Sequence, residues 1–166
     1  ISETAGYLEG QYTWSHPDVH RLHGSATSVS IIGQLYGSLV DPNTVWDDLS
    51  YKTAEAEVRV SAMCAALVGY DADKALGLFT FGGTGTTLYG IKLGAERAQP
   101  GLFNDGLRQP LRVFGSDVAH YAKLSSSAWL GLGGQAAVSV PTGEDNAMDV
   151  AALEKAMMDD QRVFLV

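Results

Sequence analysis

The sequence is short of cysteine, with a single thiol, Cys64, in 166 residues. One thiol can form neither a disulfide framework within the chain nor a set of thiolate metal ligands, so disulfide-stapled and zinc-finger folds are excluded. So little cysteine is typical of a protein that works in a reducing compartment. We therefore expect a cytoplasmic location.

Positive charge is also scarce, since 11 Lys and Arg face 19 Asp and Glu and the formal net charge is −8. Affinity for nucleic acid rests on clustered lysine and arginine, and the sequence contains no such cluster. We expect no nucleic-acid partner.

Long apolar runs are missing as well. No stretch approaches the roughly 18 consecutive apolar residues of a membrane span, and Ile1-Ser2-Glu3 does not begin a signal peptide. We expect no membrane partner.

The chain does contain enough apolar residues, 46%, for a folded domain with a substantial core. It starts at Ile1 without an initiator methionine, and its last residues, 162–166, have the apolar character of a buried strand. We therefore expect part of a larger protein. In this interpretation, residues 1–43 form an N-terminal arm and helix, and residues 44–166 form an incomplete α/β domain.

Histidines gather in residues 1–28, a polar and aromatic stretch without periodicity that we interpret as an extended arm or loop. His16, His20 and His23 could in principle ligate zinc. However, Pro17 disfavours a helical His16, no regular element would aim three rings at one point, and no cysteine completes the ligand set. We predict no metal site.

Two helices are predicted in the first half of the chain. Apolar residues recur at helical spacing from Ser28 to Val40. Thr44 and Asp47 then resemble a capping box for a longer helix that should end at Gly69. The apolar face of that helix consists of Trp46, Leu49, Thr53, Ala56, Val60, Met63 and Leu67.

Strand and helix patterns alternate in the second half. We predict strands over 77–81, 111–114, 136–140 and 163–166, with a helix from Leu88 to Pro100 and further helices over 117–130 and 149–159. This alternation indicates the α/β class, with a mainly parallel sheet flanked by helices. Ligands of such sheets bind beyond the carboxyl ends of the strands.

The glycine-rich turn between residues 82 and 86 is a candidate phosphate site. A strand, a tight glycine turn and a helix present free backbone N–H groups and the positive end of a helix dipole. No lysine follows Gly85, which excludes a P-loop, and Leu88 occupies the place of the third glycine of a dinucleotide fingerprint. A turn without a ligand stays open as the alternative.

The segment after the second predicted strand contains a second candidate, His120. We expect His120 in the first turn of its helix, after a cap formed by Ser116 and Asp117, with its ring toward the same sheet edge. The three residues are too close in sequence for a Ser-His-Asp triad, and no Gly-x-Ser-x-Gly elbow occurs. A cap followed by a structural histidine stays open as the alternative.

Several segments together carry a resemblance to a known family. They are residues 14–17 (Trp-Ser-His-Pro), 54–58, 79–89, 113–121 and 147–154. In order and spacing the chain resembles the group II pyridoxal-phosphate-dependent amino acid decarboxylases, such as the glutamate, aromatic amino acid, tyrosine and histidine enzymes. The glycine loop and the Ser-Asp-x-Ala-His segment are the most specific parts.

The resemblance implies a fold, a cofactor and a reaction. The chain would be part of the large domain of a fold-type-I enzyme (a PLP-dependent transferase fold), with pyridoxal 5'-phosphate as cofactor. The full-length protein would decarboxylate an L-amino acid and would form a homodimer or a larger assembly. The alternatives are another fold-type-I enzyme, such as a carbon–carbon lyase, and a non-catalytic fragment or assembly module.

The resemblance also implies roles for individual residues. Gly83 and Thr84 would bind the cofactor phosphate, and His120 would stack on the pyridine ring as a catalytic residue. The substrate would lie near the segment that holds His23, Gly24 and Ser25.

Two departures from the family pattern limit these roles. Gly85 and Thr87 stand where the family often has Glu and Asn. The lysine that binds the cofactor covalently and the aspartate that pairs with its ring nitrogen lie, in the family, beyond the position of Val166. Lys92 and Lys123 do not match the lysine motif, so we expect the chain alone to be inactive.

Overall fold

The computed structural model describes Gly6, residues 26–160 and residues 163–165. The chain forms two compact units, Ile1–Leu76 and Gly77–Val166. The histidine cluster of residues 16–23 and the expected substrate residues His23, Gly24 and Ser25 lie outside the described residues. The predicted division into an N-terminal arm and helix (residues 1–43) and an incomplete α/β domain (residues 44–166) stays a prediction.

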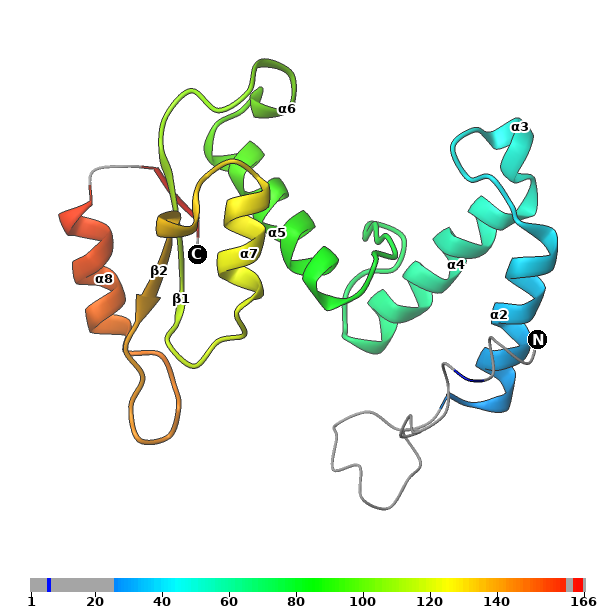
Figure 1. The fold of residues 1–166 in the computed structure, drawn as a ribbon, viewed down its shortest axis with the longest axis horizontal. Helices are drawn as coiled ribbons and strands as arrows, with labels where there is room; N and C mark the ends of the chain where they lie inside the picture. Colours follow the sequence, from blue (N-terminus) through cyan, green and yellow to red (C-terminus); the bar gives the residue numbers. More distant parts are fainter. Residues whose placement is uncertain (1–5, 7–25, 161–162, 166) are drawn as a thin grey trace. The chain divides into compact units, whose positions relative to one another are not determined.

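The described part of the first unit is helical (Figure 1). Its helices are α2 (Ser28–Val40), α3 (Asp47–Ser50) and α4 (Lys52–Leu67). The predicted helix over 28–40 is confirmed, and the Thr27 Oγ1 accepts a hydrogen bond from the Ser30 N–H at 3.2 Å at its start. Among the described helices, none combines the length and the apolar character that crossing a bilayer requires.

The single long helix predicted from Thr44 is wrong. The backbone at Tyr51 has a φ of 45° and a ψ of −118°, which separates α3 from α4. Before α3, the Asn43 Oδ1 accepts from the Val45 N–H at 2.9 Å, so an Asn turn replaces the expected threonine cap. The end of α4 is as predicted, because Gly69 follows it with a φ of 83°.

The second unit contains a three-stranded sheet and its helices. In chain order these are α5 (Gly83–Ala98), α6 (Leu102–Asp105), β1 (Leu111–Ser116), α7 (Ala122–Trp129), η1 (Gly134–Ala136), β2 (Ala137–Val140), α8 (Val150–Asp159) and β3 (Val163–Leu165). The strands run parallel in the order β2-β1-β3, with Val113 opposite Ala137 and Leu111 opposite Val163. The parallel α/β architecture predicted from the sequence is confirmed.

The strand order explains why helices cover both faces of the sheet. The connection from β1 to β2 runs in one direction across the sheet, and the connection from β2 to β3 runs in the other. Because both crossovers are right-handed by rule, α7 and α8 must lie on opposite faces. Figure 1 shows α5 and α7 on one side of the strands and α8 on the other.

The core lies where α5 packs on β1. Ile91 and Ala95 of α5 contact Leu111 and Val113 of β1, and all four are buried. Residues at the edge of this cluster are Ala98, Leu102, Leu130 and Leu132. Leu111 and Val113 alternate along β1 and share one face of the strand, whereas Phe114, which is also buried, belongs to the opposite face.

The strand predicted over residues 77–81 does not form. This segment has no ladder partner among β1, β2 and β3, and Leu78, Phe79 and Phe81 are 51%, 62% and 64% exposed. A strand is defined by hydrogen bonds to a neighbour, so an apolar sequence alone cannot make one. The helix that follows starts at Gly83, earlier than the periodicity from Leu88 predicts.

The helix predicted over 117–130 is shorter than expected, and residues 117–121 form an irregular loop. The Asp117 N–H donates to the Val140 carbonyl at 2.8 Å, and the Val118 N–H donates to the Ser116 Oγ at 3.2 Å. These bonds hold the backbone after β1 out of the helical conformation. His120 therefore precedes α7 and does not lie in its first turn.

Candidate functional site

The turn into α5 is open in the way that an anion site requires. Gly82 is the N-cap residue, with a φ of 93° and no side-chain cap. The first N–H groups of any helix, here those of Gly83, Thr84 and Gly85, have no acceptor within the helix. Gly83 is exposed, and a Cβ placed on it would meet no atom within 4 Å, so no neighbouring side chain packs on Gly83.

Threonine hydroxyls fix the shape of this turn. The Thr80 Oγ1 donates to the Gly82 carbonyl at 2.9 Å and lies 2.8 Å from the Thr86 Oγ1. The Thr87 Oγ1 donates back to the Gly83 carbonyl at 3.1 Å. Within the described part of the chain, the Thr84 hydroxyl makes no hydrogen bond. The turn is thus preorganised, and one hydroxyl remains available for a ligand.

Gly85 is needed for packing. A Cβ there would lie 3.1 Å from the Thr80 Cβ and 3.2 Å from two ring atoms of Phe81. Only a residue without a side chain lets residues 80 and 81 approach α5 this closely. This contact gives a physical reason for glycine at position 85.

The imidazole of His120 caps α7. Its Nδ1 accepts a hydrogen bond from the Ala122 N–H at 3.1 Å. A neutral ring that accepts at Nδ1 carries its proton on Nε2, so the contact selects one tautomer. The ring also contacts Tyr121, with centroids 4.2 Å apart and planes at 32°, and the side chain is exposed. His120 is thereby held in place while its Nε2–H can reach a ligand.

The two candidate segments, the turn into α5 and the loop with His120, lie toward the same end of the second unit (Figure 1). The His120 loop follows the carboxyl end of β1, and Figure 1 shows the N-terminal ends of α5 and α7 at the end of the unit toward which β1 and β2 run. The connections from these neighbouring strands leave to opposite faces. Open α/β sheets bind ligands at such a reversal.

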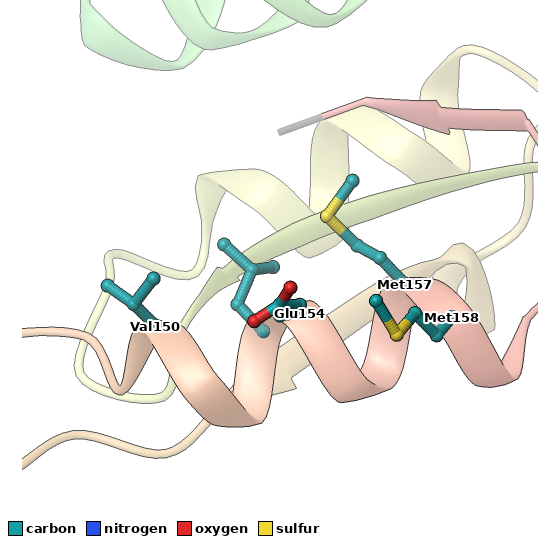
Figure 2. A pocket seen from close by; sticks show the side chains of 5 residues that line it. Val150, Glu154, Met157 and Met158 are labelled. Atoms are coloured by element: carbon teal, nitrogen blue, oxygen red, sulfur yellow. The ribbon is translucent and has the colours of Figure 1, made fainter.

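Two other hollows in the described part of this unit are lined mainly by apolar side chains, and Lys92 lines the smaller of them. A groove of about 470 Å³ runs along α8, where Figure 2 shows Val150, Glu154, Met157 and Met158 on one side of the helix. A cavity of about 240 Å³ is lined mainly by apolar side chains of α5, α6 and residues 130–132. Among the described residues, no group of three or more His, Cys, Asp or Glu side chains could hold a metal ion. The turn into α5, with its uncapped helix N-terminus, stays the candidate phosphate site.

Curated proteins of known activity are similar to this chain in sequence, although no protein-family model matches it. An L-2,4-diaminobutyrate decarboxylase of Acinetobacter baumannii is 34% identical over 116 residues, which cover 61% of the chain and 22% of the relative. The L-aspartate decarboxylase dtxS4 of Metarhizium robertsii is 22% identical over 147 residues, 88% of the chain and 29% of the relative. The chain spans less than a third of either protein.

Solved structures show that this chain is also similar in fold to amino acid decarboxylases. The tryptophan decarboxylase of Catharanthus roseus aligns with a TM-score of 0.82 at 18% identity, over 99% of this chain and 37% of that one. The glutamate decarboxylase domain of a Vibrio parahaemolyticus protein aligns with a TM-score of 0.77 at 23% identity, over 88% and 34%. The chain has the fold of these enzymes. It forms part of a fold-type-I domain, as the sequence resemblance predicts, and its relatives are amino acid decarboxylases.

The structure positions three of the predicted site residues. Gly83 and Thr84 lie in the first turn of α5, and His120 lies on the loop after β1. His23, Gly24 and Ser25 lie outside the described residues. The functional roles of all six residues stay predictions and enter the proposal below.

Proposed function

We propose that this chain forms part of the active site of a pyridoxal-phosphate-dependent decarboxylase of L-amino acids, whose activity belongs to the full-length protein. The observation that carries the proposal is the uncapped start of α5, opened by Gly82 at a φ of 93°, in a chain with a decarboxylase fold. The relatives named for diaminobutyrate and aspartate, and a structure described as Oryza sativa TDC with PLP and tryptamine, support the same reaction and cofactor.

The turn into α5 fits the phosphate of this cofactor. The N–H groups of Gly83 and Thr84 and the free Thr84 hydroxyl would donate to its oxygens. A dianion is further stabilised by the positive end of α5, a helix of 16 residues. The Thr80 and Thr86 hydroxyls would keep the turn in this shape, because they bond to each other and to the Gly82 carbonyl.

His120 would act beside the cofactor ring. Bound pyridoxal phosphate supplies an electron sink for the charge left on the substrate carbon when carbon dioxide departs. Since the Nδ1 of His120 is engaged by the Ala122 N–H, the imidazole is fixed and presents its Nε2–H. His120 would thus support the ring by stacking and hold or deliver a proton at Nε2.

The substrate is an L-amino acid, with His23, Gly24 and Ser25 on the substrate side. The enzyme is a cytoplasmic homodimer or larger assembly, which the resemblance and the scarcity of cysteine support.

The direct test is carbon dioxide release by the full-length protein. We expect release from at least one member of a panel of L-amino acids that includes 2,4-diaminobutyrate, aspartate and tryptophan, and only when pyridoxal phosphate is present. Removal of the carboxyl group as carbon dioxide separates this activity from that of a carbon–carbon lyase. A protein that binds the cofactor and releases no carbon dioxide from any amino acid tested would contradict the proposal.

A Thr84→Val variant tests the phosphate site independently of turnover. The side chain keeps its size and loses the hydroxyl, so we expect the cofactor Kd to rise at least about tenfold, since one hydrogen bond to a charged group contributes about 1.5–3 kcal/mol. Thr44→Val is the matched control, because Thr44 is an exposed threonine of the first unit and lies outside this turn. Equal cofactor affinities for both variants would argue against the assigned phosphate site.

A further inference from the structure

Lys123 is the second residue of α7, and its ammonium group lies at the carboxyl ends of two strands. The Nζ donates to the Ser116 carbonyl at 2.5 Å and to the Gly115 carbonyl at 3.3 Å, both at the end of β1. It also donates to the Ser139 Oγ of β2 at 3.1 Å. One side chain therefore connects the first turn of α7 to both neighbouring strands.

The fit around this lysine is close. A lysine ammonium has three donors, and the three oxygens match that number. A Cβ on Gly115 would lie 3.1 Å from the Lys123 Cδ, so the glycine leaves room for the lysine stem. Because its Nζ is fully engaged, Lys123 is a structural cation and not a free amine at the site.

A second connection holds the other end of the same loop. The Asp117 N–H donates to the Val140 carbonyl at 2.8 Å, and the Asp117 Oδ1 accepts from the Thr142 Oγ1 at 2.9 Å. The loop of residues 117–121 is thus attached to β2 and the residues after it at both ends. His120 lies between the two attachments, and its ring bonds to the N–H of Ala122, next to Lys123.

We infer that Lys123 is a positioning residue for His120, which sets the place of the imidazole by tying α7 to the ends of β1 and β2. This inference rests on the proposed function, in which His120 stacks on the cofactor ring. Loss of the ammonium removes one donor from the Ser116 carbonyl, which also accepts from the Ala119 N–H, and frees the start of α7 to shift. Such a shift moves the ring of His120 relative to the cofactor.

The experiment compares Lys123→Met with Lys155→Met in the full-length protein. Methionine keeps the length of the side chain and removes its charge, and Lys155 is an exposed lysine of α8 that controls for the charge change. Three quantities are measured: amide hydrogen exchange of residues 117–122 without cofactor, the Kd of pyridoxal phosphate, and the visible circular dichroism of the bound cofactor. The dichroism reports the asymmetric surroundings of the ring, which a loss of stability alone does not change.

For Lys123→Met we expect roughly tenfold faster amide exchange in the loop, a roughly tenfold higher cofactor Kd and a reduced dichroism signal. A tenfold change is about the size expected when one hydrogen bond to a charged group is lost. Lys155→Met should behave as the wild type. Ser139→Ala removes a single acceptor and should shift all three quantities in the same direction by less, which provides a readout if Lys123→Met does not fold.

Wild-type loop exchange and dichroism in Lys123→Met, even with a lower melting temperature, would overturn the inference and leave the proposed function intact. A wild-type protein that binds no pyridoxal phosphate overturns the proposed function, and the role of Lys123 with it. The two failures are therefore distinguishable.

Discussion

Three glycines at the start of α5, Gly82, Gly83 and Gly85, differ in backbone conformation and in how closely other atoms pack against them. Gly82 has a positive φ of 93°, which side chains other than glycine rarely tolerate. Gly85 is in close contact with Thr80 and Phe81, whereas Gly83 faces open space. Adjacent positions of identical residue type should therefore respond differently to the same substitution.

A pair of valine substitutions checks this difference. Gly85→Val pushes branched methyl groups against Thr80 and Phe81, and we expect the free energy of unfolding to fall by about 1–3 kcal/mol relative to Gly83→Val. Both variants carry valine in the same helical turn, so the helix propensity cancels in the comparison. Urea unfolding of the two full-length proteins measures the difference, and equal midpoints would contradict the packing role of Gly85.

At the scale of elements, Glu96 joins the end of α5 to the start of α6. Its carboxylate oxygens accept from the N–H groups of Gly101 and Phe103, both at 2.8 Å. These hydrogen bonds, with the N–H of Gly101 contributing most, lower the pKa of Glu96 below its ordinary value of 4.5. A carboxyl with a lowered pKa in the folded state stabilises that state when ionised.

The stabilisation by Glu96 is present above the unfolded-state pKa and is lost as the pH falls through the lower folded-state pKa. We expect Glu96→Gln to be less stable than the wild type at pH 7, with the difference shrinking as the pH is lowered from about 5 to about 3. Thermal unfolding across this range provides the measurement, and a difference independent of pH would refute the account.

The ion pair between Arg112 of β1 and Asp160, just after α8, is partly buried. The Arg112 Nε lies 2.9 Å from the Asp160 Oδ2, both side chains are about one-fifth exposed (20% and 21%), and the guanidinium also donates to the Gln135 carbonyl at 2.7 Å. We expect Arg112→Met to lower the free energy of unfolding by about 1–3 kcal/mol, because Gln135 and Asp160 lose a charged donor.

An exposed pair provides the control for this prediction. Lys52 and Glu55 lie 2.7 Å apart on α4, with the lysine 91% exposed. Lys52→Met should change the free energy of unfolding by no more than about 0.5 kcal/mol, since water already solvates both charges. Denaturant unfolding with a probe in each unit tests both variants, and equal effects would show that burial does not decide the outcome.

The elements that the sequence predicts correctly are those whose own residues contain the signal. β1, β2 and α8 have apolar periodicity and, for α8, Asp149 as a cap that accepts from the Ala152 N–H at 3.0 Å. The two incorrect predictions, a strand over residues 77–81 and a helix that includes residues 117–121, have causes outside the local sequence pattern. The loop at 117–121 depends on a bond to Val140, and the segment 77–81 lacks a neighbouring strand among those described.

The candidate site also contains features that the sequence predicts and features that it does not. The glycine turn and His120 are recognisable from residue types and spacing, because a phosphate cradle needs glycine and helix N–H groups. The contacts of Lys123 are not, since its partners Ser116 and Ser139 come together only when β1 and β2 pair. A lysine in a helical pattern gives no sign that its ammonium will meet strand carbonyls.

At the scale of the whole molecule, a large amount of apolar surface faces solvent. No residue of α2 is buried, and Leu35, Tyr36 and Leu39 are 59%, 69% and 75% exposed. The same holds for Met63 and Leu67 of α4, at 66% and 86%. Apolar patches of this kind are rare on stable monomers and promote association.

We expect residues 1–166, expressed alone, to bind a hydrophobic dye strongly and to elute from a sizing column as associated species. The full-length protein at the same molar concentration should bind less dye per chain. Fluorescence titration and light scattering measure the two effects. A monodisperse 166-residue monomer with weak dye binding would contradict the prediction.

The central place of β1 in the sheet has a consequence for the order of folding during synthesis. β2 follows β1 after one helix, whereas β3 follows only after a second helix, although both pair directly with β1. The pairing of β1 with β2 therefore becomes possible on the ribosome while the other edge of β1 still lacks its neighbour. Until β3 emerges, that edge is a row of unpaired backbone groups, and a pause in translation after α8 prolongs the interval in which chaperones or other nascent chains can bind it.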